Sequence, residues 1–295
     1  MDLKRYLHLA FLYFCFNSFG QTTYTGFIDK YPIELSALIY SDSEVEAVYV
    51  YTNVDTPIQL NGKIVKGTLI LTEMEASGKA SARFSFPGFS ENATNVSGIW
   101  TNLITKRQLT VKLTKSYSLT GPSPTVGKDQ ELIQTESLKD HYFKLVIEKN
   151  AGAYEPRVKA VKVLEKKTDR TVQIIKVDCQ LWGLNNITIG DFNFDGKPDF
   201  SVFESSYAGA NTSSLYYLYD STSGRYIDSK YSGTSLEFDP KTKTITEYNQ
   251  CCAGQQVTTA VYKVVNNKMV MTEQHCFIWD EKKQELVERT LKDCQ

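Results

Sequence analysis

The sequence predicts an all-β protein in two domains, and three observations support this fold class. Aromatic residues are abundant, with 18 Tyr and 15 Phe among 295 residues, and aromatic side chains suit pleated sheets better than helices. Short apolar runs recur with the two-residue alternation of half-buried strands. No long segment has the 3.6-residue periodicity of an amphipathic helix. The length of the chain suggests two domains.

The first twenty residues predict a signal peptide that is removed from the mature protein. Lys4 and Arg5 precede an apolar run that is too short to span a bilayer, and small residues follow at the spacing of a cleavage site. We expect cleavage after Gly20, no transmembrane segment in the mature chain, and export to the periplasm or the extracellular space. The alternative is an uncleaved anchor.

The remaining chain is expected to form two β domains joined by a linker. Residues 22–117 read as a small antiparallel β domain of short strands, with a turn at Asn61-Gly62. Pro, Gly and hydroxyl residues open the segment 118–140, which predicts a linker with a short helix at 130–137. The strand pattern resumes over residues 141–295, which predict the second β domain.

The charge balance excludes nucleic acid as the main partner. The chain has 33 Lys and Arg against 34 Asp and Glu, for a formal net charge of -1. Binding to a phosphate backbone needs a basic surplus, and no run of Lys or Arg stands out.

The cysteines predict a disulfide in the exported chain. Five remain after cleavage, so at least one thiol stays unpaired; they are Cys179, Cys251, Cys252, Cys276 and Cys294. A two-residue hairpin turn at Asn266-Asn267 would bring Cys276 near Cys251 and Cys252, which predicts a bond from Cys276 to one of these two. A bond between Cys251 and Cys252 is not expected, because neighbouring Cα atoms are too close for relaxed disulfide geometry. Buried free thiols are the alternative.

An acidic loop in the second domain has the ligand spacing of a calcium site. Its candidate ligands are Asp191, Asn193, Asp195, the backbone carbonyl of Lys197, and Asp199. These are hard oxygen donors on one tight turn, and Gly196 permits the sharp bend. Val202 stands where an EF-hand has its bidentate Glu, so the loop resembles the calcium loops of FG-GAP repeats instead. We expect structural calcium; the alternatives are a turn without metal and an exposed, non-ligating Asp199.

Catalytic constellations are missing from the sequence, which predicts a protein that is not an enzyme. Three His do not supply the spaced ligands of a zinc site, and neither a nucleophile elbow nor a phosphate-binding Gly loop occurs. A convergent pair of carboxylates stays possible.

A loop of small polar residues around one aromatic residue is a candidate partner-binding site. Its members are Ser206, Tyr207, Gly209, Asn211 and Ser213. Loops of this kind on a rigid scaffold often bind partners, although a solvated connection would have the same composition.

Residues 142–294 resemble a family of exported bacterial FG-GAP-like immunity proteins, which neutralise lysozyme-like effectors of type IV secretion systems and are similar to periplasmic lysozyme inhibitors. The matching segments are the loop 191–199, the small residues 208–211 and the runs 216–220, 222–226 and 239–245. The resemblance implies a β-propeller-like scaffold and an inhibitor whose loop enters the cleft of a peptidoglycan hydrolase. It also implies that Asn211 or Ser213 bonds the catalytic carboxylates of the target. The alternative function is a non-catalytic module that binds carbohydrate or protein in the cell envelope.

Overall fold

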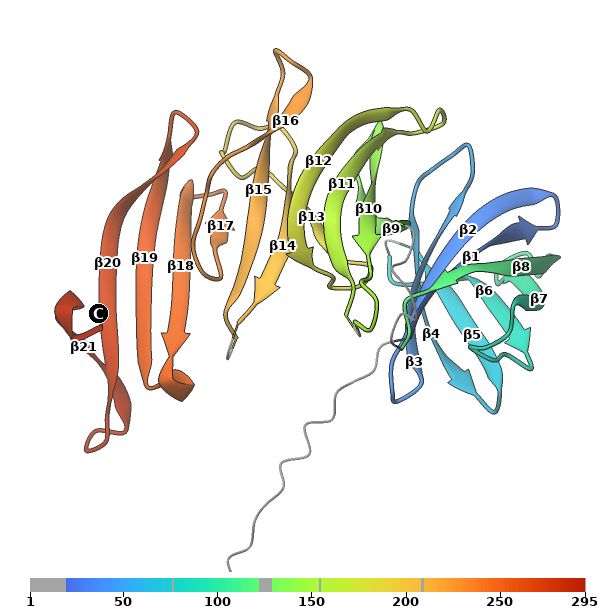
Figure 1. Cartoon of the computed structure of the whole chain (residues 1–295), viewed down its shortest axis with the longest axis horizontal. Helices are drawn as coiled ribbons and strands as arrows, with labels where there is room; N and C mark the ends of the chain where they lie inside the picture. Colours follow the sequence, from blue (N-terminus) through green and yellow to red (C-terminus); the bar gives the residue numbers. More distant parts are fainter. Residues whose placement is uncertain (1–19, 76, 122–128, 154, 208–209, 295) are drawn as a thin grey trace, which may run out of the picture.

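The regular structure of the described residues is almost entirely β-strand, as the sequence predicts. The computed structural model describes residues 20–75, 77–121, 129–153, 155–207 and 210–294. An eight-stranded barrel lies at one end of the molecule, and three sheets follow it in a row (Figure 1). Within the described ranges, none of the helices is long and apolar enough to cross a membrane. The predicted signal peptide, apart from Gly20, lies outside the described residues.

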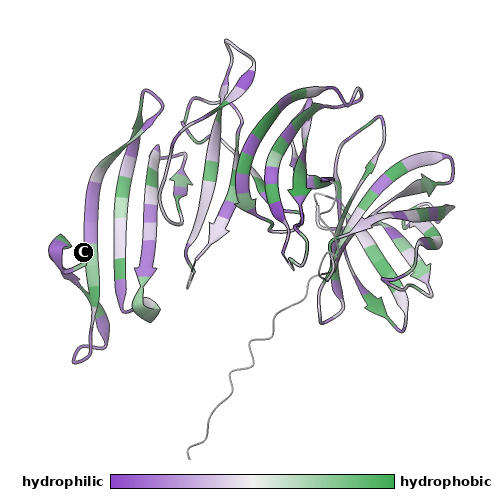
Figure 2. Cartoon of the chain, viewed as in Figure 1, coloured by the Kyte–Doolittle hydropathy of each residue, from purple (hydrophilic) through white to green (hydrophobic). Residues whose placement is uncertain are grey.

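The N-terminal barrel is an antiparallel meander that closes when its first strand pairs with its last. Its strands are β1 (Gly20–Ile28), β2 (Tyr31–Ile39), β3 (Glu44–Tyr51), β4 (Ile58–Val65), β5 (Thr68–Met74), β6 (Ala80–Pro87), β7 (Asn95–Asn102) and β8 (Gln108–Ser118). Hydrophobic and hydrophilic residues alternate along these strands (Figure 2), because successive side chains point into the barrel and out of it. Tyr24, Tyr49 and Phe84 are among the large side chains that fill the interior.

Glycines allow neighbouring barrel strands to approach closely. A Cβ atom at Gly62 would lie 1.9 Å from the carbonyl oxygen of Ile70, and one at Gly26 would lie 2.0 Å from that of Lys112. The predicted turn at Asn61-Gly62 is wrong, because both residues lie inside β4. The glycine is needed there for a close backbone approach within a strand rather than for a chain reversal.

Three antiparallel sheets form the rest of the chain. The first sheet contains β9 (Gln130–Ser137), β10 (His141–Glu148), β11 (Arg157–Glu165) and β12 (Thr171–Gln180). The second contains β13 (Ile187–Gly190), β14 (Asp199–Ser206), β15 (Thr212–Asp220) and β16 (Arg225–Asp228). The third contains β17 (Glu237–Asp239), β18 (Thr244–Cys251), β19 (Gln256–Val265), β20 (Lys268–Asp280) and β21 (Glu285–Arg289). Two short 3-10 helices, η1 (Cys252–Gly254) and η2 (Leu291–Cys294), complete the described elements.

Residues 130–137 form strand β9 and not the predicted short helix. Leu132, Ile133 and Gln134 are buried one after another, a pattern that the edge strand of a covered sheet accommodates and a single helix face does not. Contacts with β10 therefore override the local preference of this segment.

The sheets stack through their apolar faces. Phe200 and Tyr217 on the second sheet pack with Phe143 of the first sheet in one core. Tyr216 points the opposite way and packs with Phe238 of the third sheet in another. Neighbouring residues of β15 thus supply two different cores, which fixes the second sheet between its neighbours.

The barrel is attached to the first sheet by a shared core and by polar contacts. Leu38, Val48 and Val50 of the barrel belong to the same apolar cluster as the first sheet. Lys144 Nζ lies 2.9 Å from Glu34 Oε2, and both side chains are less than one-fifth exposed. Such a half-buried pair fixes orientation more than it adds stability.

Candidate functional site: the acidic loop and the β14–β15 loop

The acidic loop connects β13 to β14 at one end of the second sheet. It bends sharply because Phe194 and Gly196 have φ values of 62° and 84°. Both oxygens of the Asp191 carboxylate face the interior of the loop. Oδ1 accepts a hydrogen bond from Asp195 N at 2.9 Å, and Oδ2 accepts one from Gly196 N at 2.8 Å. The backbone of the loop therefore wraps around the first of the predicted ligands.

Asp199 is the buried carboxylate of the acidic loop. The alternative of an exposed Asp199 is therefore wrong. Its side chain is 0% exposed, and it accepts hydrogen bonds from Phe192 N at 2.9 Å and Tyr219 N at 2.8 Å. Burial raises the pKa of Asp199 to about 6; the two backbone hydrogen bonds oppose this increase, and the nearby Asp195 and Asp191 add to it. The carboxylate thus ties the loop to β15.

The donor chemistry of the loop fits calcium, although the acidic side chains alone do not enclose an ion. All the predicted ligands offer hard oxygen atoms, and the mutual repulsion of three carboxylates would be relieved by a cation. Among the described residues, no three His, Cys, Asp or Glu side chains converge as a metal group. Calcium would therefore also need the Asn193 amide and the Lys197 carbonyl. Lys197 Nζ lies 3.9 Å from Asp195 Oδ2 and offsets part of the negative charge.

The β14–β15 loop presents one exposed aromatic side chain between two strands. Tyr207 is 53% exposed. Its backbone N donates a hydrogen bond to Asn211 O at 2.9 Å, and its hydroxyl lies 3.1 Å from Ser213 Oγ. Ser206 N donates a hydrogen bond to Gln180 Oε1 at 3.0 Å, which connects the loop to the first sheet. Gly209 lies outside the described residues.

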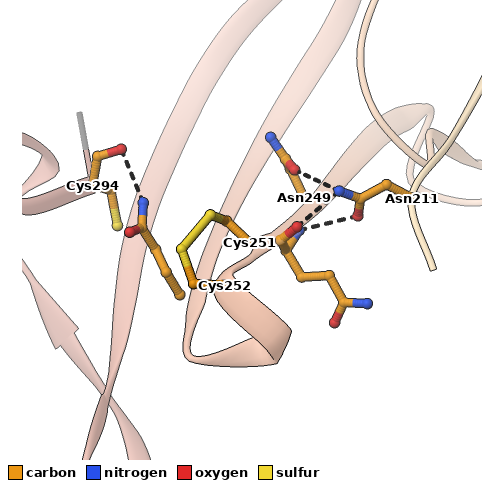
Figure 3. The surroundings of a disulfide bond; sticks show 7 residues. Asn211, Asn249, Cys251, Cys252 and Cys294 are labelled. Atoms are coloured by element: carbon orange, nitrogen blue, oxygen red, sulfur yellow. Dashed lines mark hydrogen bonds between the residues drawn. A yellow bond between two sulfur atoms is a disulfide. The ribbon is translucent and has the colours of Figure 1, made fainter. Parts of the chain in front are cut away.

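Asn211 connects the other side of this loop to the third sheet. Its side chain is only 8% exposed. Nδ2 donates hydrogen bonds to Asn249 Oδ1 at 2.9 Å and to Gln250 O at 2.8 Å, and Oδ1 accepts one from Gln250 N at 3.1 Å (Figure 3). Asn211 therefore positions the loop. Of the other predicted contact residues that the structure describes, Ser206 and Tyr207 are exposed and Ser213 is partly exposed.

The disulfides differ from the predicted pairing. Cys276 bonds Cys294, and Cys251 bonds its neighbour Cys252 beside the Asn211 contacts (Figure 3). Strand β19 lies between β18 and β20, so Cys276 is about 10 Å from β18, which exceeds disulfide reach. The vicinal bond, which was not expected, joins the last residue of β18 to the first residue of η1. Among the residues that the structure describes, Cys179 is a free thiol, and it is buried.

Trp182 is an exposed aromatic residue beside β14, the strand that leads into the β14–β15 loop. We did not single it out from the sequence. It is 58% exposed, and its ring lies 4.9 Å from that of Phe203. Its backbone N donates a hydrogen bond to the Oδ1 atom of Asn186, which is 1% exposed, at 2.7 Å. A single Trp just after a strand, in the short connection 181–186, was the available signal.

Two solved structures show distant likenesses to the chain. No family model matches the chain, and no curated protein matches it. A Xanthomonas type IV secretion system related protein aligns over 58% of this chain and 100% of its own, with 14% identity and a TM-score of 0.36. A protein from Lactobacillus plantarum aligns over 92% of this chain and 95% of its own, with 10% identity and a TM-score of 0.25. Both TM-scores are too low to identify a fold or a function.

Proposed function

We propose that this protein is an exported, non-enzymatic inhibitor of a lysozyme-like peptidoglycan hydrolase, and that it acts through the β14–β15 loop. The observation that supports this most is the presentation of Tyr207. Its side chain is half exposed, while Ser206 and Asn211 on either side of it are hydrogen-bonded to the first and third sheets. A rigidly held aromatic residue loses little entropy on binding and is a frequent anchor of protein interfaces.

The scaffold proposed for this function is FG-GAP-like and propeller-like. Two stacked four-stranded meanders and a third of five strands have the order expected of consecutive blades. The acidic loop and the partner loop lie at opposite ends of β14, because that strand begins at Asp199 and ends at Ser206. A single rigid strand therefore connects the two candidate sites.

Structural calcium is part of the proposal. Asp191, Asn193, Asp195, Asp199 and the carbonyl of Lys197 would hold the ion. Calcium supplies positive charge that offsets the repulsion among the carboxylates. The chain's own residues do the positioning: the Asp199 carboxylate accepts hydrogen bonds from Phe192 N and Tyr219 N and so fixes the start of β14.

The proposal is tested by measuring peptidoglycan lysis by a panel of lysozyme-type hydrolases, with the purified mature protein added in calcium. We expect the protein to inhibit one member of the panel at a stoichiometric ratio and to show no lytic activity itself. A protein that lyses peptidoglycan, and loses this activity when one carboxylate is replaced, would be an enzyme instead.

Export is tested separately by N-terminal sequencing of the protein recovered from the envelope or the medium of a bacterial host. We expect the sequence to begin at Gln21. An N-terminus at Met1 would support the uncleaved anchor.

A further inference from the structure

A groove on the outer wall of the barrel has no part in the proposed inhibition. It has a volume of about 710 Å³ and is lined by β1, β2, β7 and β8, together with Thr52. Ligand sites commonly have volumes of roughly 300–1,000 Å³. The wall bends here at Gly26, where β1 approaches the backbone of β8 too closely for a side chain. The groove is thus formed by the curvature of the sheet rather than by loops.

The strand register arranges the outward side chains of this wall in two rows. The first row consists of Asn95, Thr114, Thr25 and Glu34, each paired across to the next. The second row consists of Ser97, Lys112, Phe27 and Pro32. A row of hydrogen-bonding groups therefore runs beside an apolar platform made by Phe27 and Pro32.

Phe27 is the unusual member of these rows. It is 51% exposed near the end of β1, in a groove whose other outward groups are mostly polar. Packing inside the barrel does not require it, because its neighbours Gly26 and Ile28 occupy the inward positions of β1 and Ile28 is 0% exposed. An exposed aromatic face next to hydroxyl and amide groups is suited to a ligand that has one apolar face and polar edges.

The charges of the groove favour a ligand without net charge. Lys112 supplies one ammonium group and Glu34 one carboxylate to the lining. Lys144, from the neighbouring sheet, holds Glu34 Oε2 at 2.9 Å and fixes this carboxylate at one end of the first row. Because Lys144 already pairs with Glu34, Lys112 is the one cation of the described lining left without a compensating carboxylate, and a single ammonium group is too little for phosphate-rich or strongly acidic ligands.

We propose that this groove binds an uncharged oligosaccharide. A pyranose ring has one face of C–H groups, which would stack on Phe27, and hydroxyl groups at its rim, which would bond Thr25, Thr114 and Asn95. Four strands at a spacing of about 4.8 Å give rows about 14 Å long, the length of a short β-1,4-linked chain. The barrel would thereby attach the protein to a glycan.

The test is calorimetric titration of the full mature protein with chitotetraose and, separately, cellotetraose. We expect binding of at least one tetrasaccharide, and a loss of affinity of about tenfold or more in Phe27→Ala because the stacking platform is removed. Trp182→Ala is the matched control: it removes another exposed aromatic residue, lies outside the groove, and should leave the affinity unchanged.

Each outcome decides the proposal. Chitotetraose binding alone would indicate recognition of N-acetyl groups, and cellotetraose binding alone would indicate recognition of hydroxyls; both support the site if Phe27→Ala weakens them. Absence of binding by both sugars at millimolar concentration overturns the proposal. So does binding that Phe27→Ala leaves intact or that Trp182→Ala weakens equally. Because no hydrolase is present, the result is independent of the inhibition assay.

Discussion

Replacing Asn211 by alanine should destabilise the junction between the second and third sheets. The substitution removes two donated hydrogen bonds and one accepted hydrogen bond, and it leaves the N–H and C=O groups of Gln250 without their partner. A net hydrogen bond contributes about 1 kcal/mol, and an unsatisfied buried group costs about 1–3 kcal/mol. We therefore expect a loss of about 2–4 kcal/mol in the free energy of unfolding.

Urea denaturation monitored by tryptophan fluorescence measures this loss, and hydrogen exchange locates it. The amide of Gln250 should exchange about 30-fold faster if the local opening free energy falls by about 2 kcal/mol. Ser213→Ala is the matched control, because it removes only the exposed contact with the Tyr207 hydroxyl and should change stability by less than about 0.5 kcal/mol. An Asn211→Ala variant as stable as this control, with unchanged exchange at Gln250, would refute the positioning role of Asn211.

Three further predictions concern the acidic loop, the free thiol and the barrel wall. Calcium at about 100 times its dissociation constant should stabilise EDTA-treated protein by about 2.7 kcal/mol, as measured by calorimetry. The Asp191→Ala/Asp195→Ala variant should show no such gain. A wild type that melts at the same temperature with and without calcium would contradict the site. Cys179 is buried, and burial chiefly raises its pKa to about 12, so a thiol reagent should label it only after unfolding; labelling in the native state would contradict its placement. Gly62→Ala would set a Cβ atom 1.9 Å from Ile70 O and should cost more than about 1 kcal/mol; a melting temperature equal to that of the wild type would argue against this packing.

Local pattern predicted much of the strand content because each signal acts over a few residues. The predicted turn at Asn266-Asn267 joins β19 to β20 with Val265 opposite Lys268. Both Asn residues have positive φ, at 51° and 58°, as a two-residue hairpin turn requires.

The sequence pattern did not predict which distant strands pair with each other. Closure of the barrel depends on pairing between β1 and β8, which are separated by the whole meander. The disulfide prediction failed for a related reason: strand order, together with the bulge between Val261 and Tyr262, decides which residues lie near Cys276. Neither feature has a local signature in the residues concerned.

The same distinction between local and long-range features applies to the candidate sites. The acidic turn was recognisable because all its candidate ligands lie within nine consecutive residues, which form the loop after β13 and the first residue of β14. The positioning role of Asn211 was not recognisable, because its partners Asn249 and Gln250 lie on another sheet. Trp182 had no motif around it beyond its place just after a strand, and its exposure became clear only from the structure.

The most direct test of inhibition is a titration of peptidoglycan lysis by the hydrolase that the panel identifies, with the wild-type protein and with Tyr207→Ala. We expect the wild type to abolish lysis near one molecule per hydrolase molecule. Loss of the Tyr207 side chain should weaken inhibition about tenfold or more, as expected for an interface anchor. Absence of inhibition across the panel, or equal inhibition by Tyr207→Ala, would contradict the proposed role of the β14–β15 loop.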